Sequence, residues 1–514
     1  MAIIPDGISI CLKIDNSEWI LRVVDQSKES YKQILKATSV FGGVQIFKIV
    51  IDLLKSKIIA LFLGPEGVGM FSLFQNPVQL ISQLTGLGIN TSAIRDVAQS
   101  REDEIELGKT VKTVRSWSRV SGLVGMLFLL FAAPLVSRWT FGSEEHAMDF
   151  RFLSLAVLFI ALGNENDVIL KGQRKIVYIA KAGVSSALCG LIASIPAYYF
   201  LGKDGIAAIV VLTFFAVYFF NRHYARKEII KEVDLTGREI FQRGKTMASL
   251  GSMLVLASVV HTAIAYLTNL FIRNYGDLAD VGFYQAGMAI TTISIDMVYN
   301  AMAGDFYPRL SAVCNDRNKS NDLINQQAEV ATLVCTPILV CMIAFVPLLI
   351  RLFLSSEFLI IESFIHWILL AAVFRAASYT VYYMILAKGN TKGCLVFALL
   401  INGSLLLFNP LGYYLLGLKG LGIAYLLMMC IYTLAIVLYV RRKYGVGYQS
   451  TFIKMQFESI VLCVLIFLSV LYLPKSLAYI VNSLIVIPVC YIYLKALNER
   501  TEFLTTIKNR FHGK

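Results

Sequence analysis

Apolar stretches of about 20 residues, separated by short polar turns, recur along the chain from residue 37 to residue 494. A helix needs about 20 apolar residues to cross the hydrocarbon core of a bilayer, because each residue adds about 1.5 Å. The pattern therefore predicts an all-α polytopic membrane protein. Its fourteen expected spans are 37–63, 68–94, 118–138, 152–170, 176–200, 205–221, 246–274, 281–308, 328–350, 361–387, 393–416, 420–440, 455–473 and 476–494.

Composition supports this prediction. Hydrophobic residues make up 57% of the 514 residues and charged residues only 16%, whereas a soluble protein has about 25% charged residues. Residues 1–35 are polar and mixed, and they lack the basic start, apolar run and small-residue cleavage site of a signal peptide. We expect them to form a cytoplasmic extension.

The distribution of positive charge predicts the orientation. The net charge is +13, and most of the 47 Lys and Arg residues fall on alternate polar segments, beginning with the N-terminal one. Because positively charged loops stay in the cytoplasm, both termini should lie there. The basic excess is thus a topology signal. No zinc-finger, RNP or helix-turn-helix pattern accompanies it, so nucleic acid is not an expected partner.

The two halves of the chain resemble each other. GPEGVGMFSLF (64–74) recurs as DLADVGFYQAG (277–287), and KGQRK (171–175) recurs as KGNTK (388–392), at offsets near 215. An even number of spans separates the copies, which predicts two six-helix lobes of parallel topology with a substrate cleft between them. The expected division is 1–35 (extension), 36–227 (first lobe), 228–245 (cytoplasmic linker), 246–443 (second lobe), 444–494 (two added helices) and 495–514 (cytoplasmic tail).

Ionisable residues inside the spans are the candidate site. A charge facing lipid costs at least about 2.5–3.5 kcal/mol, so several such residues in one chain should face a wet cavity. At the repeat offset, Lys48 matches His261 and Gln83 matches Asp296. The predicted anion-binding residues are Lys48, Lys55, Lys181, Arg273 and Arg375. The predicted polar or coupling residues are Asn76, Gln83, Gln285, Asp52, His261 and Asp296.

Most of these residues also have a structural interpretation. Lys48 and Asp52 are spaced to pair along one helix, and Asp296 could pair with a neighbouring helix. Lys181 could reach back to the cytoplasmic interface and Arg273 could anchor the outer one, because long basic side chains extend toward water. His261 could be a packed core residue. Cations outnumber anions among the candidates, and such a cavity suits a phosphate or diphosphate, with amides such as Gln83 and Gln285 for sugar hydroxyls.

Motifs for chemical catalysis are missing from the sequence. We find no Walker A, GxSxG, HExxH or kinase signature. The nine cysteines and five histidines have no metal-ligand spacing, so neither a metal nor a cofactor is expected. These features predict a transporter rather than a glycosyltransferase or ligase. A proton gradient, a sodium gradient or the membrane potential would drive it.

Four segments together resemble a known family. FLGPEGVGMFSLFQNPVQLISQLTGLGI (62–89), ILKGQRK (169–175), VGFYQAGMAITTISIDMVYNAMAGDFYPRLS (281–311) and LAKGNTK (386–392) are similar to Wzx-type flippases of lipid-linked oligosaccharides, the O-antigen translocases of the multidrug/oligosaccharidyl-lipid/polysaccharide exporter superfamily. The resemblance covers residues 36–443. The extension 1–35 and the last two helices depart from many members.

This resemblance implies a fold like that of the MATE exporters, with two lobes that alternate in access. It also implies that an undecaprenyl-diphosphate-linked glycan moves from the cytoplasmic to the periplasmic leaflet of a bacterial inner membrane, for O-antigen, lipopolysaccharide or related polysaccharide assembly. Membrane lipids and other assembly proteins are the implied partners, and the family's basic cavity residues match Lys48 and Arg375. Fourteen spans leave a peptidoglycan-precursor flippase open as an alternative. A drug antiporter, which would need an acidic cavity, is less favoured.

Overall fold

The computed structural model describes residues 16–228, 230–231 and 233–501; within them, the side chains of 16–49, 253–254, 292–294, 297, 301, 304 and 500–501 are outside the description. These residues form helices and no strand. The helices are α1 (Asn16–Gly86), α2 (Ile89–Gln99), α3 (Glu104–Phe141), α4 (Ala147–Gly172), α5 (Ile176–Leu201), α6 (Gly205–Ala225), α7 (Gly237–Tyr275), α8 (Leu278–Val313), α9 (Arg317–Ala344), α10 (Val346–Phe353), α11 (Glu362–Ala372), α12 (Arg375–Ala387), α13 (Thr391–Tyr444), α14 (Ser450–Tyr472) and α15 (Lys475–Thr501). Two short 3₁₀ turns, Gly202–Asp204 and Ser356–Ile361, join α5 to α6 and α10 to α11.

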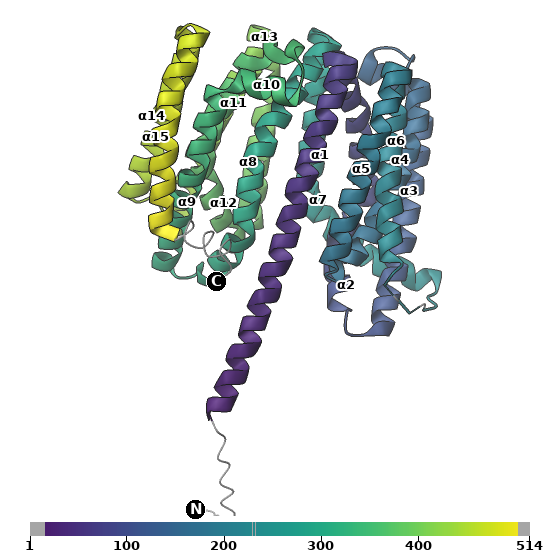
Figure 1. Cartoon of the computed structure of the whole chain (residues 1–514). Helices are drawn as coiled ribbons and strands as arrows, with labels where there is room; N and C mark the ends of the chain where they lie inside the picture. The colour runs from purple at the N-terminus through teal and green to yellow at the C-terminus, as the bar shows by residue number, and fades with distance from the viewer. Residues whose placement is uncertain (1–15, 229, 232, 502–514) are drawn as a thin grey trace, which may run out of the picture.

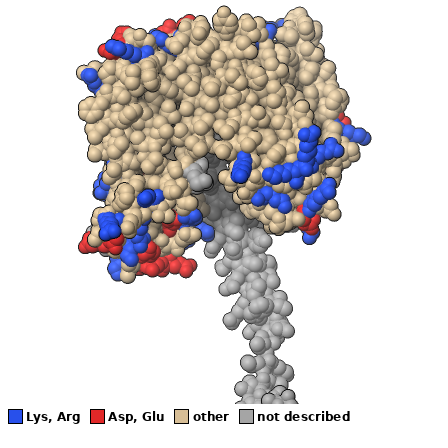
Figure 2. Space-filling view, turned by 180° about the vertical axis from the view of Figure 1, so that it is seen from behind, with Lys and Arg blue, Asp and Glu red and all other residues tan. Residues whose placement is uncertain are grey.

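The expected spans coincide with these helices. Nine helical stretches of the described chain are long and apolar enough to cross a membrane, or ten if the bent pair Ser356–Ala372 and Arg375–Ala387 counts as one. Ile176–Ala225 and Thr391–Tyr444, with 50 and 54 residues, are each long enough for two crossings. Figure 2 shows the surface expected of such a protein, with an uncharged belt and with Lys, Arg, Asp and Glu gathered above and below it. The protein is a multi-pass membrane protein.

Glycines break the longest helices into separate spans. α1 turns at Gly64 (φ 64°, ψ −165°) and α13 turns at Gly417 (φ 59°, ψ −143°). A positive φ of this kind strains any residue with a Cβ, so glycine fits both corners. The predicted ends of spans 1 and 11, at residues 63 and 416, therefore match the corners. Three boundaries differ. α1 begins at Asn16, inside the predicted extension, α7 begins at Gly237, inside the predicted linker, and α15 continues to Thr501, inside the predicted tail.

Acidic and hydroxyl side chains start several helices. Asp103 accepts from the backbone N–H groups of Ile105 and Glu106 at the start of α3. Thr236 and Glu239 form a capping box at the start of α7, and the bond from the Thr236 N–H holds the pKa of Glu239 below its usual value. These bonds satisfy amide groups that the first helical turn leaves unpaired.

The helices gather into two groups with α1 and α7 between them (Figure 1). α3, α4, α5 and α6 pack together on one side, and α9 and α11 to α15 pack on the other. α7 contacts α1, α2 and α3, which belong to the first half of the chain, as well as α13, which belongs to the second half. The start of α1 and the end of α15 lie at the same end of the molecule, as an even number of crossings requires (Figure 1).

Both ends of the bundle hold a close backbone crossing between the halves. Gly69 of α1 faces α8 at the end near the Gly64 corner, where a Cβ on Gly69 would lie 2.2 Å from the carbonyl oxygen of Leu278. At the opposite end, a Cβ on Gly88 would lie 2.1 Å from the carbonyl oxygen of Gly251 in α7. The two halves of the chain thus touch at both ends of the central region.

Candidate functional site

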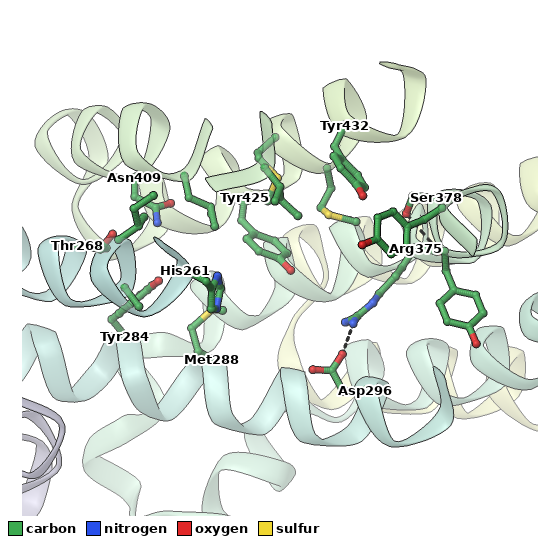
Figure 3. Close-up of a pocket in the computed structure, with 18 of the residues that line it drawn as sticks. His261, Thr268, Tyr284, Met288, Asp296, Arg375, Ser378, Asn409, Tyr425 and Tyr432 are labelled. Carbon is green, nitrogen blue, oxygen red and sulfur yellow. Dashed lines mark hydrogen bonds and ion pairs between the residues drawn. The ribbon is translucent and has the colours of Figure 1, made fainter. Parts of the chain in front are cut away.

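A cavity of about 560 Å³ lies between α7, α8, α12 and α13 (Figure 3). Among the described side chains that line it, Arg375 and Asp296 are the only Lys, Arg, Asp or Glu residues, and His261 and Gln285 are also part of its wall. Sequence reasoning had selected these four residues. Its interior is rich in tyrosine, with Tyr284, Tyr379, Tyr382, Tyr425 and Tyr432 on the wall.

Arg375 and Asp296 form an ion pair across the cavity (Figure 3). About a third of each side chain stays exposed, 33% for Arg375 and 30% for Asp296. The guanidinium carbon lies 5.2 Å from the centre of the Tyr299 ring, close enough for a cation–π contact. A guanidinium with five donors can bind a phosphate and a carboxylate by the same two-pronged geometry.

The helix break before Arg375 places this side chain in the cavity. α11 ends at Ala372 and α12 begins at Arg375, and the segments on either side are bent by 49°. Breaks in membrane helices free backbone carbonyls, which must find new donors in the absence of water. Here Gln456 of α14 donates to the carbonyl of Val373 over 2.8 Å. Thr433 of α13 adds a second, longer bond of 3.4 Å to the carbonyl of Phe374, which also accepts from the backbone N–H of Ser378.

α14 and the turn before it hold α12 at a second place. The Tyr448 hydroxyl donates to the carbonyl of Ala377 and lies 2.6 Å from the hydroxyl of Thr380. Thr332 of α9 donates to the side-chain oxygen of Gln456 over 3.4 Å and so orients this amide toward Val373. The first of the two added C-terminal helices, α14, and the turn before it therefore support the segment that carries Arg375, a role that no sequence motif indicated.

His261 lines the cavity with a fixed hydrogen bond. Its Nδ1 lies 3.1 Å from Oδ1 of Asn402, while the amide nitrogen of Asn402 donates to the carbonyl of Ala398. Because Asn402 presents an acceptor, the Nδ1 atom of His261 carries the proton and donates.

Several predicted anion-binding residues lie elsewhere, and this corrects the expected single basic cavity. Lys55 donates to Thr213 of α6 over 3.0 Å, within the first group of helices. Lys181 is exposed on α5. Arg273 donates to the carbonyl of Phe141 and packs on Gly142, so it joins the ends of α7 and α3. Lys55 and Arg273 each find a partner on a distant helix, which sequence spacing does not reveal, while Lys181 remains exposed.

The remaining predicted residues also lie outside the Arg375 cavity or outside the described side chains. The side chain of Lys48 lies outside the described residues, so its predicted place in the cavity stays a prediction. Asp52 is exposed on α1 and interacts electrostatically with Lys55. Asn76 lines neither of the two larger cavities. Gln83 lines a second cavity of about 350 Å³, between α1, α2, α4, α6 and α7, and accepts a hydrogen bond from Thr262.

Sequence reasoning missed some residues of the cavity wall. Tyr425 and Tyr432 stand two turns apart on α13, and both face the cavity (Figure 3). Their spacing is visible in the sequence, yet it is equally typical of ordinary helix packing. The Asn402 partner of His261 is 141 residues away, so only the fold brings the two together.

Comparison with known proteins places the chain among transporters. A family model described as "Polysaccharide biosynthesis protein" matches residues 58–362. The chain is 24% identical over 379 residues to the lipid III flippase of Escherichia coli strain K12, which covers 70% of this chain and 86% of that protein.

Solved structures share its fold. The inward closed conformation of the lipid II flippase MurJ superposes with a TM-score of 0.68 at 17% identity, over 90% of this chain and 99% of that one. An inward-facing multidrug transporter of the MATE family gives a TM-score of 0.62 at 17% identity, over 79% and 98% of the two chains. These likenesses confirm the expected two-lobed exporter fold.

Proposed function

Because this chain belongs to the family of polysaccharide biosynthesis proteins, a membrane transporter family by its relatives, we propose that it flips an undecaprenyl-diphosphate-linked oligosaccharide. The glycan-bearing head group would pass from the cytoplasmic to the periplasmic leaflet of a bacterial inner membrane, with both termini in the cytoplasm. The lipid tail would remain in the bilayer while the two groups of helices alternate in access.

The observation that carries the proposal is the position of Arg375. Its guanidinium projects from a broken helix into a tyrosine-lined cavity between membrane helices, with a third of the side chain exposed. A diphosphate offers several oxygen acceptors to such a group, and burial strengthens the charge-assisted bonds. The tyrosines offer ring faces and hydroxyls to a sugar adjoining the phosphates.

The balance of charge also bears on the alternatives. A carrier of cationic drugs would need a net acidic cavity. In this cavity, the positive charge of Arg375 balances the negative charge of Asp296, so the described side chains give no net acidity. A peptidoglycan-precursor flippase would use the same diphosphate chemistry, and it differs only in the sugar. The choice between these two therefore depends on which glycan the cell supplies.

Surface-polysaccharide display tests the proposal. In a strain lacking the gene, the wild-type chain should restore display, and Arg375→Ala and Arg375→Glu should abolish it while membrane levels stay normal. Arg351→Ala is the matched control, because Arg351 is an exposed arginine of α10 outside the cavity. Full display by Arg375→Glu would exclude the guanidinium as the diphosphate ligand.

A further inference from the structure

The cavity of about 350 Å³ around Gln83 differs in chemistry from the one around Arg375. Three of its lining residues are amides with no hydrogen-bond partner for the side chain within the described part of the chain: Gln79 on α1, Asn90 on α2 and Asn164 on α4. Gln83, Ser82, Thr91 and Ser258 add further polar groups, and no Lys, Arg, Asp or Glu lines this cavity among the residues whose side chains the structure describes.

The three unpaired amides are available to a molecule in the cavity, because polar groups inside a protein normally find hydrogen-bond partners. Gln79, Asn90 and Asn164 are each half-buried and line the cavity. Each amide offers both donors and acceptors.

The cavity also lies at a helix break, as the Arg375 cavity does. The second span ends at Gly86 and resumes as α2 at Ile89, across two residues of positive φ, Leu87 (48°) and Gly88 (63°). Interrupted membrane helices mark binding sites in transporters, because irregular backbone is tolerated only where it is buried or lines a cavity. Asn90 and Thr91 follow this break directly.

The two cavities are neighbours along α7. Ser258 lines the amide cavity and His261 lines the Arg375 cavity, and residues three apart are adjacent on a helix surface. The hydroxyl of Thr262, next in the chain, donates to Gln83 over 3.2 Å. One molecule could therefore have its charged part near Arg375 and its neutral part among the amides.

We infer that the amide cavity binds neutral sugars of the lipid-linked glycan, through their hydroxyl and acetamido groups. Such groups pair with amides donor to acceptor and acceptor to donor, and Phe214 supplies an apolar surface for a ring face. None of the described wall residues is charged, which disfavours a second phosphate at this place. This inference rests on the proposed function and adds to it the part of the site that reads the glycan.

Binding of two lipids to the purified full-length protein tests the inference. The probes are undecaprenyl diphosphate and undecaprenyl diphosphate N-acetylglucosamine, measured by calorimetry in detergent. The wild type should bind the sugar-bearing lipid about tenfold more tightly, which corresponds to about 1.4 kcal/mol. Gln79→Leu/Asn164→Leu should lose this preference and keep its affinity for undecaprenyl diphosphate. Asn90→Leu, at the break, should reduce the preference on its own.

Gln242→Leu is the control, because Gln242 is an exposed amide at the start of α7 outside the cavity. It should retain the full preference. An undiminished preference in both leucine variants, or an equal loss of affinity for the two lipids, would overturn the inference. Failure of the wild type to bind either lipid would instead overturn the proposed function, and Arg375→Ala should weaken both lipids alike.

Discussion

Gly69 and Gly282 occupy equivalent positions in the two halves of the sequence, and their backbones meet. A Cβ on Gly69 would lie 3.0 Å from the backbone nitrogen of Gly282, and a Cβ on Gly282 would lie 2.9 Å from that of Gly69. Their partners are also equivalent. The carbonyl oxygen of Leu278 faces Gly69, and the carbonyl oxygen of Pro65, which occupies the matching position in the first half, faces Gly282. The local two-fold axis of the repeat therefore passes between the two glycines.

This contact predicts that adding a side chain at either glycine prevents the two helices from closing at that end of the bundle. Gly69→Ala or Gly282→Ala would place a methyl group against a carbonyl oxygen, and overpacking of this kind costs about 1–3 kcal/mol. We expect polysaccharide display to fall about tenfold or more. Gly403→Ala is the control, since nothing lies within 4 Å of its added Cβ.

Accessibility labelling distinguishes this effect from simple misfolding. Ser72→Cys, placed near the contact between α1 and α8 in a cysteine-free background, should react faster with a water-soluble maleimide when Gly69→Ala is present. An unchanged labelling rate together with normal display would show that the crossing does not limit opening.

The ion pair predicts that Asp296 competes with the substrate for Arg375. Asp296→Asn removes the carboxylate while keeping its size, so the guanidinium becomes available to phosphate oxygens. We expect the affinity for undecaprenyl diphosphate to rise by about threefold to tenfold, because a charge-assisted bond no longer has to be broken. Turnover should fall, since a tighter complex releases its ligand more slowly.

The measurement is calorimetric binding beside a transport assay on the same preparation. Arg375→Ala/Asp296→Asn should bind as weakly as Arg375→Ala alone, because the carboxylate acts through the guanidinium. Weaker binding by the single Asp296→Asn variant would mean that the carboxylate positions Arg375 rather than competes for it.

The bond from Gln456 to Val373 predicts that α14 influences substrate binding from outside the cavity. Gln456→Leu would leave the Val373 carbonyl without this donor, at a cost of about 1–3 kcal/mol. The break would shift and Arg375 with it, so we expect affinity for undecaprenyl diphosphate to fall several-fold.

Gln456→Glu offers a sharper comparison, because a carboxylate keeps the size of the amide and lacks its N–H donor. Phe457→Leu, an exposed neighbour on α14, should leave binding unchanged. If all three variants have the same thermal stability and the same affinity for undecaprenyl diphosphate as the wild type, Gln456 has no role in positioning Arg375.

Sequence patterns predicted the fold well, for physical reasons that particular residues illustrate. Span length is set by the bilayer, so hydropathy alone located the helices, and the glycine corner at Gly64 followed from its GPEG turn. The offset that matched residue 64 with residue 277 also placed Gly69 opposite Gly282, although the contact itself became visible only in three dimensions.

The site was harder to predict. Arg375, Asp296, His261 and Gln285 were identified because charge and polarity are rare inside membranes. Arg273 and Lys55 share that rarity but bond to Phe141 and Thr213, partners more than 100 residues away. Nothing in the local sequence separates a basic residue that finds such a partner from one that faces a cavity.

The two halves have kept the glycine crossing but differ in what surrounds their cavities. The described wall around Gln83 carries no charge, while the wall around Arg375 carries an ion pair. Under the proposed function, this separation lets the amide wall change with the sugar while Arg375 serves the shared diphosphate. Substitutions among the amides would then alter which glycan is carried without a change to the transport cycle.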